Sequence, residues 1–587
     1  MAFEAKPDQP KNIKPKCSVT HSEEAPIMPE ATQQQYEIRK IDVRTVLGLL
    51  ALAVTYESCL FSFVLPVSVL LSINQDIGPS NNIAWMATAW SLAGAVVMTV
   101  AGRLSDILGR RNFFLSGNLL GVIGCAISCR ATDVSMIILG ATFIGLSGGL
   151  QQLAFAAASE IVPKKNRGQT LAMLTVVSLP GSAFGAPIAY SIIANADWRW
   201  TYYVALIVNG LGFVLILICY WPPDFLDLQS EGKTRRQQFA ELDFVGILLL
   251  GGGLTVFLIG IGFGGNPYDW TSATVLCPII LGGLCAFVAF PLWEVYSPDT
   301  IVKLCPPHLF QNVRTVVVPC GVTFVAGMAL ISLGTLWPQQ ITRLFTTVPR
   351  TIGWYGLANQ GAATVGFIVF GQTFGTLRKT RWQFIFVVTL MVLFLGLNAT
   401  VTQHTPARAV AFVGIASAMI GATNCIGTLI VQLGARDEDI GLATGLLNSV
   451  RAVGGGVGVA IYSSLLKNRL ASTWAVDIGD AVVKAGLPTS SVANFLGALQ
   501  TANFTSIPEV NPTIIEVGLE AQKNVYVGAF RMVYLVTIAF GGLAVIGALF
   551  VGSVDDKLTQ QINVQLDRPH MVGLGNSEAD TAGGEKC

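Results

Sequence analysis

The sequence predicts an all-α membrane protein that crosses the bilayer fourteen times. Of its 587 residues, 52% are hydrophobic and only 12% are charged, whereas soluble chains carry about 25% charged residues. The charged residues gather in short segments between apolar runs of about twenty residues, the length that an α-helix needs to cross a hydrocarbon core. Because lipid offers no hydrogen bonds to the backbone, we expect each run to form a helix.

The apolar runs form two groups of six with a pair between them. We expect an N-terminal six-helix bundle at 46–222, a linker region with two extra helices at 223–314 and a C-terminal six-helix bundle at 315–553. The polar flanks, 1–45 and 554–587, are expected to be disordered tails. The predicted spans are 46–71, 83–101, 112–130, 134–158, 169–194, 200–221, 243–263, 273–296, 315–337, 352–377, 382–402, 408–433, 442–465 and 532–553.

The distribution of Lys and Arg predicts the orientation. Alternate short loops, such as 102–111 and 378–381, are much richer in these residues than the loops opposite them. Because Lys and Arg collect on the cytoplasmic side, we expect both tails to be cytoplasmic and 466–531 to be a long external loop. That loop holds the sequon Asn503-Phe504-Thr505, a candidate glycosylation site.

A weak internal repeat supports two related halves. The basic sequence GRLSDILGRR, which begins at Gly102, has a degraded copy, GQTFGTLRKTR, which begins at Gly371. The glycines Gly181 and Gly185 of the fifth span have counterparts in the thirteenth span, at 454 and 458. Repeated halves around a central site are typical of secondary transporters.

The sequence GRLSDILGRR between the second and third spans resembles the signature of the major facilitator superfamily, Gly-x-Leu-x-Asp-x-x-Gly-Arg-Arg/Lys. Its defined positions here include Gly102, Asp106, Gly109, Arg110 and Arg111. The resemblance implies the major facilitator fold, and it implies that Asp106 helps to lock one half against the other during transport. The alternative is a solvated basic loop that only sets the topology.

Two ionisable residues lie deep within predicted spans, where charge is costly and usually functional. Glu57 lies about halfway along the first span, and Arg451 lies about a third of the way into the thirteenth. We interpret both as candidates for transport or proton coupling, with Glu57 as the group that binds and releases the proton. The alternative is a static polar contact, including a pair between the two. The arginine that opens the Arg-x-x-x-Gly motif of many antiporters is replaced here by Ala141.

The fifth span reads LPGSAFGAPIAYS, which is similar, though imperfectly, to the Gly-x-x-x-Gly-Pro motif of antiporters in this superfamily. Gly181 and Gly185 would allow close helix packing, and Pro187 should bend the helix. Aromatic and amide side chains in or near the spans could line a pocket, although bonds between helices are the commoner role of such amides. These side chains are Tyr56, Trp90, Gln151, Gln152, Asn209, Asn359, Gln372, Asn424 and Asn448.

The remaining patterns exclude other classes of protein. A net charge of +1 argues against a nucleic-acid partner, which would need a basic face. The sequence has no Walker loop, so ATP is not expected to drive it, and it has neither a catalytic motif nor a metal-binding cluster. We therefore expect no cofactor, no metal and no enzyme activity. The cysteines lie mostly in apolar runs and are interpreted as packing residues.

Further segments resemble one branch of the superfamily, the fungal trichothecene-efflux-pump-like transporters, which are relatives of fourteen-helix drug:proton antiporters. They include SEIVPKKNRG at 159–168, DWRWTYY at 197–203, ELDFVG at 241–246 and SVRAVGGGVGVAIY at 449–462. The resemblance implies a monomeric plasma-membrane exporter of a hydrophobic small molecule, driven by protons. A siderophore or nutrient importer, a vacuolar or vesicle location, and a membrane sensor that transports nothing remain as alternatives.

Overall fold

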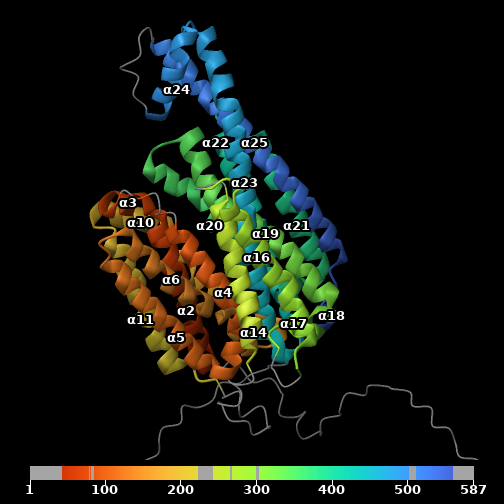
Figure 1. Ribbon diagram of the computed structural model, residues 1–587. Coiled ribbons are helices and arrows are strands. Elements are labelled where there is room, and N and C mark those ends of the chain that lie inside the picture. Colours follow the sequence, from red (N-terminus) through yellow and green to blue (C-terminus); the bar gives the residue numbers. More distant parts are fainter. Residues whose placement is uncertain are drawn as a thin grey trace, which may run out of the picture. The chain divides into compact units, whose positions relative to one another are not determined.

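The computed structural model describes residues 43–78, 80, 83, 85–222, 242–264, 268–298, 303–501 and 511–559. These residues belong to one compact unit. They are almost entirely helical, and the only β-type pairing among them is an isolated bridge between Gly264 and Tyr268. Helices lie at all fourteen predicted positions (Figure 1). The Asn503 sequon and nearly all of the two predicted tails lie outside the described residues.

The N-terminal bundle is arranged around α2, which contacts each of the helices α4 to α11. Small residues on α2 explain this central place, because Ala51, Ala53 and Ser58 are buried and allow close approach. The helices are α2 (Val43–Ser68), α3 (Leu70–Ile77), α4 (Trp85–Leu108), α5 (Arg110–Cys129), α6 (Val134–Gln151), α7 (Ala154–Glu160), α8 (Arg167–Val177), α9 (Leu179–Ser182), α10 (Gly185–Asn195) and α11 (Arg199–Cys219).

The two extra spans pack against each other through glycines. A methyl group on Gly282 would lie 2.3 Å from the backbone nitrogen of Phe257, so these helices touch backbone to backbone. They also contact α4 and α23, one helix from each bundle. The segments are α14 (Phe244–Ile247), η4 (Leu248–Gly252) and α15 (Gly253–Phe263), followed by α16 (Ala273–Leu284), η5 (Cys285–Ala289) and α17 (Phe290–Tyr296).

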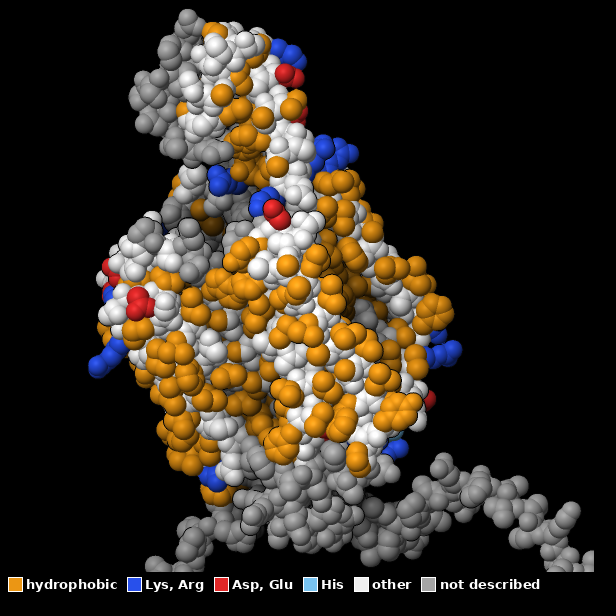
Figure 2. Space-filling view, in the orientation of Figure 1, with side chains coloured by type: hydrophobic (Ala, Val, Ile, Leu, Met, Phe, Trp, Pro, Cys, Tyr) orange, Lys and Arg blue, Asp and Glu red, His pale blue; other side chains and the backbone are white. Residues whose placement is uncertain are grey.

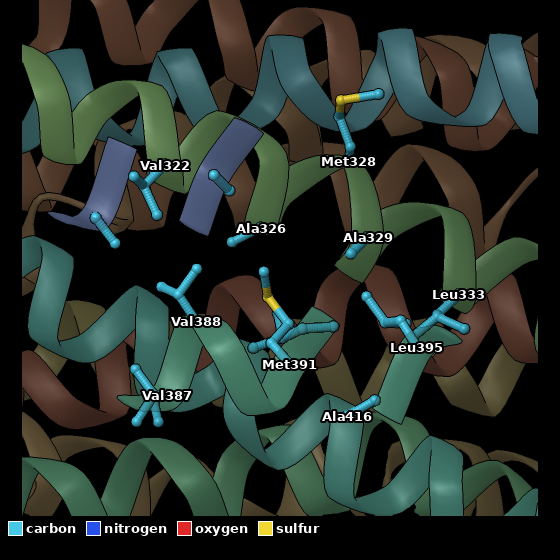
Figure 3. Close-up of a cluster of buried hydrophobic side chains, with 14 of the residues drawn as sticks. Val322, Ala326, Met328, Ala329, Leu333, Val387, Val388, Met391, Leu395 and Ala416 are labelled. Carbon is cyan, nitrogen blue, oxygen red and sulfur yellow. The ribbon is translucent and has the colours of Figure 1, made fainter. Parts of the chain in front are cut away.

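The C-terminal bundle has the largest apolar core. Side chains of α19 face those of α21 there, with Ala416 of α22 beside them (Figure 3). Short helices α18 (Pro307–Gln311) and η6 (Val313–Val317) lead into this bundle. Its helices are α19 (Val318–Gln340), η7 (Ile341–Phe345), α20 (Pro349–Leu377), α21 (Thr380–Leu397), η8 (Asn398–Thr400), α22 (Pro406–Gly434), α23 (Ile440–Lys484) and α25 (Pro512–Phe550).

The segment predicted as a long external loop, 466–531, is mostly helical in its described part, and its external location stays a prediction. Helix α23 continues to Lys484, α24 covers Val492–Thr501, and α25 already begins at Pro512. These ends pack on a small apolar core of their own that contains Ile478, Val482, Phe495 and Ile514. The spacing of Ile478 and Val482 places both on one helix face, which explains why the helix persists beyond the span. We call residues 466–501 and 511–531 the helical cap (Figure 1).

The exposed surface supports insertion in a membrane. Eleven helices in the described part of the chain are long and apolar enough to cross one. The other three predicted positions hold α4, the segment α8–α10 and α20. Hydrophobic side chains cover the sides of the spanning helices in Figure 2, whereas charged side chains gather mainly toward their ends. Large apolar side chains such as Leu248 and Ile280 are exposed on these helices, a pattern that suits contact with lipid.

Candidate functional site

The fifth predicted span is broken twice. Its three pieces, α8, α9 and α10, are separated at Ser178 and at Ala183–Phe184. Pro180 lies two residues after the first break, and Pro187 lies three residues after the second. A proline has no N–H to donate to the preceding turn, and its ring crowds the carbonyl there. The sequence predicted a bend at Pro187; the break before Pro180 is an additional finding.

The first break places a backbone donor against the carboxylate of Glu57. The N–H of Gly181 donates to Oε1 of Glu57 at 2.6 Å, across 124 positions of the sequence. Glu57 is only 5% exposed. A methyl group on Gly181 would lie 2.9 Å from Oε2 and 3.0 Å from Oε1, so only glycine leaves room for this contact. The structure therefore joins two predicted site residues, Glu57 and Gly181, in one contact.

The second carboxylate oxygen of Glu57 is available for chemistry. Oε2 is buried and has no hydrogen-bond partner among the described residues. A proton can bind to this oxygen or leave it while Oε1 keeps its bond to Gly181. Helix breaks that free backbone groups at the membrane midplane are a recurrent way to build ion and substrate sites in transporters.

Arg451 lies apart from Glu57. No ion pair joins them in the described part of the chain, so the predicted alternative of a Glu57–Arg451 pair is not formed. The backbone and Cγ of Arg451 pack against Gly327 of α19, where a methyl group would lie 2.2 Å from the carbonyl oxygen of Arg451.

Aromatic side chains cross from one bundle to the other beside Tyr56. The ring of Tyr56 meets Phe155 of α7 edge-on, with centroids 4.5 Å apart. Phe155 in turn contacts Phe367 of α20, at 5.7 Å between centroids. About two turns farther along the same face of α2, the rings of Phe63 and Trp90 stack with centroids 3.7 Å apart. Tyr56 and Trp90 were predicted from the sequence, but the phenylalanines were not, because apolar rings within spans resemble ordinary lipid-facing residues.

Several of the predicted pocket amides form bonds between helices. Gln151 donates to the side-chain oxygens of Asn118 at 3.0 Å and Asn209 at 2.9 Å. Asn209 also donates to Ser62 at 2.8 Å, and Ser417 donates to Asn359 at 3.0 Å. These hydrogen bonds between helices are enough to explain why the amides are buried, without a contact to substrate. Asn424 differs, because its buried side-chain oxygen has no partner among the described residues.

The signature sequence is helical rather than a loop. Helix α4 continues to Leu108, and only Gly109, with a φ of 83°, separates it from α5. A left-handed backbone favours glycine, which explains Gly109. Gly102 does not form a turn: it lies within α4, where a methyl group would be 2.8 Å from the Cα of Leu442 in α23. Asp106 lies in the last turn of α4, and its lock role stays a prediction.

The two arginines of the signature hold different partners. Arg110 donates to Glu160 at the end of α7, at 2.5 Å, and its guanidinium lies against Gly441 at the start of α23. Arg111 donates to the carbonyl oxygen of Leu217 at 2.7 Å and lies over the ring of Trp221 at 3.4 Å. Arg110 thus faces the other bundle, whereas Arg111 ties α5 to the end of α11.

Further contacts join the bundles at the same end. Lys164 forms an ion pair with Asp437 at 2.8 Å, and the N–H of Lys165 donates to the carbonyl oxygen of Thr559 at 3.0 Å. Between these points, α8 and α20 touch through glycines, since a methyl group on Gly168 would lie 2.5 Å from the oxygen of Gly371. This end, which the charge pattern predicts to be cytoplasmic, is therefore closed.

A carboxylate at the other end of the N-terminal bundle ties two loops together. Asp76, at the end of α3, accepts from the indole of Trp198 at 2.9 Å and from Arg199 at 3.2 Å. The hydrogen bond from Trp198, with the charge of Arg199, holds the pKa of Asp76 below its usual range. This contact fixes the segment DWRWTYY against the end of the first span.

Similarity to known proteins assigns the chain to a family of efflux transporters. The model of the family described as "Fungal trichothecene efflux pump (TRI12)" matches residues 26–582. The chain belongs to this family. The trichothecene efflux pump TRI12 of Fusarium sporotrichioides is 27% identical over 91% of each chain. The MFS-type efflux transporter ffsH of Aspergillus flavipes is 26% identical over 83% of this chain and 82% of its own.

A solved structure supports the fold. The proton:xylose symporter XylE aligns with a TM-score of 0.50 at 14% identity, over 85% of this chain and 94% of the symporter. At that identity the likeness establishes the major facilitator fold alone. The expected all-α major facilitator fold is therefore confirmed, and the count of fourteen spans stays a prediction. The chain is a multi-pass membrane transporter of the efflux type and not an enzyme, as predicted.

Proposed function

We propose that this protein exports a hydrophobic small molecule across the plasma membrane in exchange for protons, and that Glu57 carries the proton. The observation that supports this most is the contact between Glu57 and the broken helix. One carboxylate oxygen is held by Gly181, while the other is buried and has no described partner. Of the residues within the predicted spans, Glu57 is the one carboxylate near a midpoint.

The position of Glu57 suits alternating access. Glu57 lies on α2 at the centre of the N-terminal bundle, and its partner lies on α9, which contacts α20 of the C-terminal bundle. Movement of one bundle against the other would therefore change the surroundings of the carboxylate. A coupling group must meet each side of the membrane in turn, and a midplane residue between moving bundles can do so.

The contacts at the predicted cytoplasmic end support a two-state cycle. Gly102 against Leu442 holds α4 on α23, and Arg110 against Gly441 holds the start of α5 there. The pair of Lys164 and Asp437 adds a charged contact that can separate in water. Opening toward the cytoplasm requires all of these contacts to break. We propose that these contacts, together with Asp106, hold the two bundles in the state that is closed to the cytoplasm. Breaking them is the step of the transport cycle that the signature sequence would control.

Transport in inside-out membrane vesicles tests the function. We expect a pH gradient, acidic inside, to drive uptake of a radiolabelled trichothecene, which serves as the probe. Glu57→Gln keeps the size and hydrogen bonding of the side chain but cannot titrate. It should abolish gradient-driven uptake while exchange of labelled for unlabelled probe without a gradient persists.

Glu520→Gln provides the matched control, because Glu520 is exposed on α25 within the helical cap. This variant should transport like the wild type. Uptake by Glu57→Gln with a normal dependence on pH would show that Glu57 is structural and that coupling lies elsewhere. Gradient-driven movement of the probe in the opposite direction would favour the importer.

A further inference from the structure

A basic cavity lies between the two bundles at the end that the charge pattern predicts to be cytoplasmic. Its volume is about 420 Å³, which falls within the range of about 300–1,000 Å³ typical of small-molecule sites. Lys164 and Arg167, just before and at the start of α8, line it from the N-terminal bundle. Arg436, between α22 and α23, and Lys557, after α25, line it from the C-terminal bundle. The cationic side chains therefore come from both bundles.

Arg167 is the most informative of these residues, because its guanidinium is buried with most of its donors unused. The residue is 0% exposed. Its Nε donates to the carbonyl oxygen of Ser159 at 2.9 Å, but Nη1 and Nη2 are buried and have no hydrogen-bond partner among the described residues. The carboxylate of Glu160 is bound instead to Arg110, at 2.5 Å. Buried charged groups are normally hydrogen-bonded or paired, so these donors indicate a place for an acceptor.

The acidic side chains of the cavity do not neutralise its basic ones. Asp437 is paired with Lys164 at 2.8 Å and forms no ion pair with Arg167 in the part of the chain that the structure describes. Asp556, the other carboxylate of the lining, is exposed. Four basic side chains minus two acidic ones leave a formal net charge of +2 on the lining. The cavity therefore suits an anion with several oxygen acceptors.

We propose that this cavity binds a phosphate group of a cytosolic anion, and that the bound anion links the two bundles in the state that is closed to the cytoplasm. The planar N–H donors of Arg167 match two phosphate oxygens, while Arg436 and Lys557 supply positive charge from the other bundle. Separation of the bundles would pull these cations apart, so the anion binds the closed state preferentially and stabilises it. The inference does not depend on the proton role of Glu57.

Binding of sodium pyrophosphate to the purified full-length protein tests the proposal. The protein is held in nanodiscs of uncharged phosphatidylcholine, and isothermal titration calorimetry measures the affinity. We expect a Kd below about 1 mM and a rise in the melting temperature, because a ligand that binds only the folded protein stabilises it. Sodium chloride at the same ionic strength should give neither effect. An equal rise in melting temperature with sodium chloride would overturn the proposal.

Variants from each bundle test the link between the bundles. Arg167→Gln should weaken pyrophosphate binding at least about tenfold, because it removes charge-assisted hydrogen bonds, and Arg436→Gln should weaken it at least about threefold. Lys379→Gln is the matched control, because Lys379 is exposed at the same end but does not line the cavity. Equal weakening in the control would overturn the site in favour of diffuse charge attraction. An effect of Arg167→Gln without one of Arg436→Gln would refute the link. If Arg167→Gln does not fold, the double variant Arg436→Gln, Lys557→Gln carries the test.

A second set of nanodiscs distinguishes a soluble anion from a lipid headgroup as the source of the phosphate. These discs contain phosphatidylinositol 4-phosphate, whose headgroup carries the same chemistry. Unchanged pyrophosphate affinity in these discs would support a soluble anion. Weaker pyrophosphate binding, together with a higher melting temperature that Arg167→Gln abolishes, would support the same site with the lipid as ligand. Absence of pyrophosphate binding in the first discs and of any lipid effect in the second would overturn the proposal.

Discussion

The fifth and thirteenth spans have similar glycines but use them differently. In the fifth span, prolines break the helix, and the amide of Gly181 binds a carboxylate. In the thirteenth, α23 is unbroken for 45 residues, and Gly454 packs against the backbone of α19, where a methyl group would lie 2.2 Å from the oxygen of Phe324. In both spans, glycines allow two helices to approach closely. A nearby proline determines whether a backbone N–H at that approach is free to bind a side chain.

The largest expected effect falls on the packing side of this comparison. Gly454→Ala would force a methyl group into the carbonyl of Phe324, and backbone cannot yield as a flexible side chain can. We expect this overpacking to lower the free energy of unfolding by about 1–3 kcal/mol or more. It would be seen as a lower apparent melting temperature and a poor yield of monodisperse protein. Gly456→Ala is the matched control, because its methyl group would meet only the end of Leu258. Equal stability of the two variants would refute the packing interpretation.

The second-largest effect is expected for Gly181→Ala, which should lower transport with little change in stability. In Gly181→Ala, the new methyl group would meet the end of the Glu57 side chain, which can swing away, and would lie 3.0 Å from the Cβ of Leu60, which must shift by a few tenths of an ångström. The loss of a hydrogen bond to a charged group, worth about 1.5–3 kcal/mol, should lower gradient-driven uptake at least about tenfold while the melting temperature stays near that of the wild type. Gly210→Ala, with nothing within 4 Å, should be silent. Normal uptake by Gly181→Ala would contradict the role of this donor.

The smallest effects on transport are expected when the two prolines of the fifth span are replaced. Pro180→Ala restores an N–H and allows α8 to join α9, which would draw the amide of Gly181 into the helix and away from Glu57. We expect reduced uptake with unchanged or higher thermal stability. Pro187→Ala restores a donor only beyond Gly181, so uptake should stay close to that of the wild type. A reversed order of the two variants in the vesicle assay would show that the second break, not the first, matters for coupling.

The sequence predicts the helices well because length and hydropathy determine which segments enter lipid. Glu57 could be singled out for the same reason, since a carboxylate in a span is rare. Its donor could not be identified, because a backbone amide has no signal of its own; Pro180 was the available clue. The contact of Phe155 with Phe367 and the helical cap also escaped prediction, because both depend on tertiary packing between segments that look ordinary in isolation.

The uninterrupted length of α23 has a mechanical consequence. A single rod about 66 Å long, at 1.5 Å per residue, connects the residues beside Arg110, the guanidinium of Arg451 and the helical cap. Such a rod acts as a lever: a tilt of about ten degrees displaces one end by roughly 11 Å relative to the other. A spectroscopic label on the cap would therefore report, from the far side of the bilayer, whether the contact at Gly102 is made or broken.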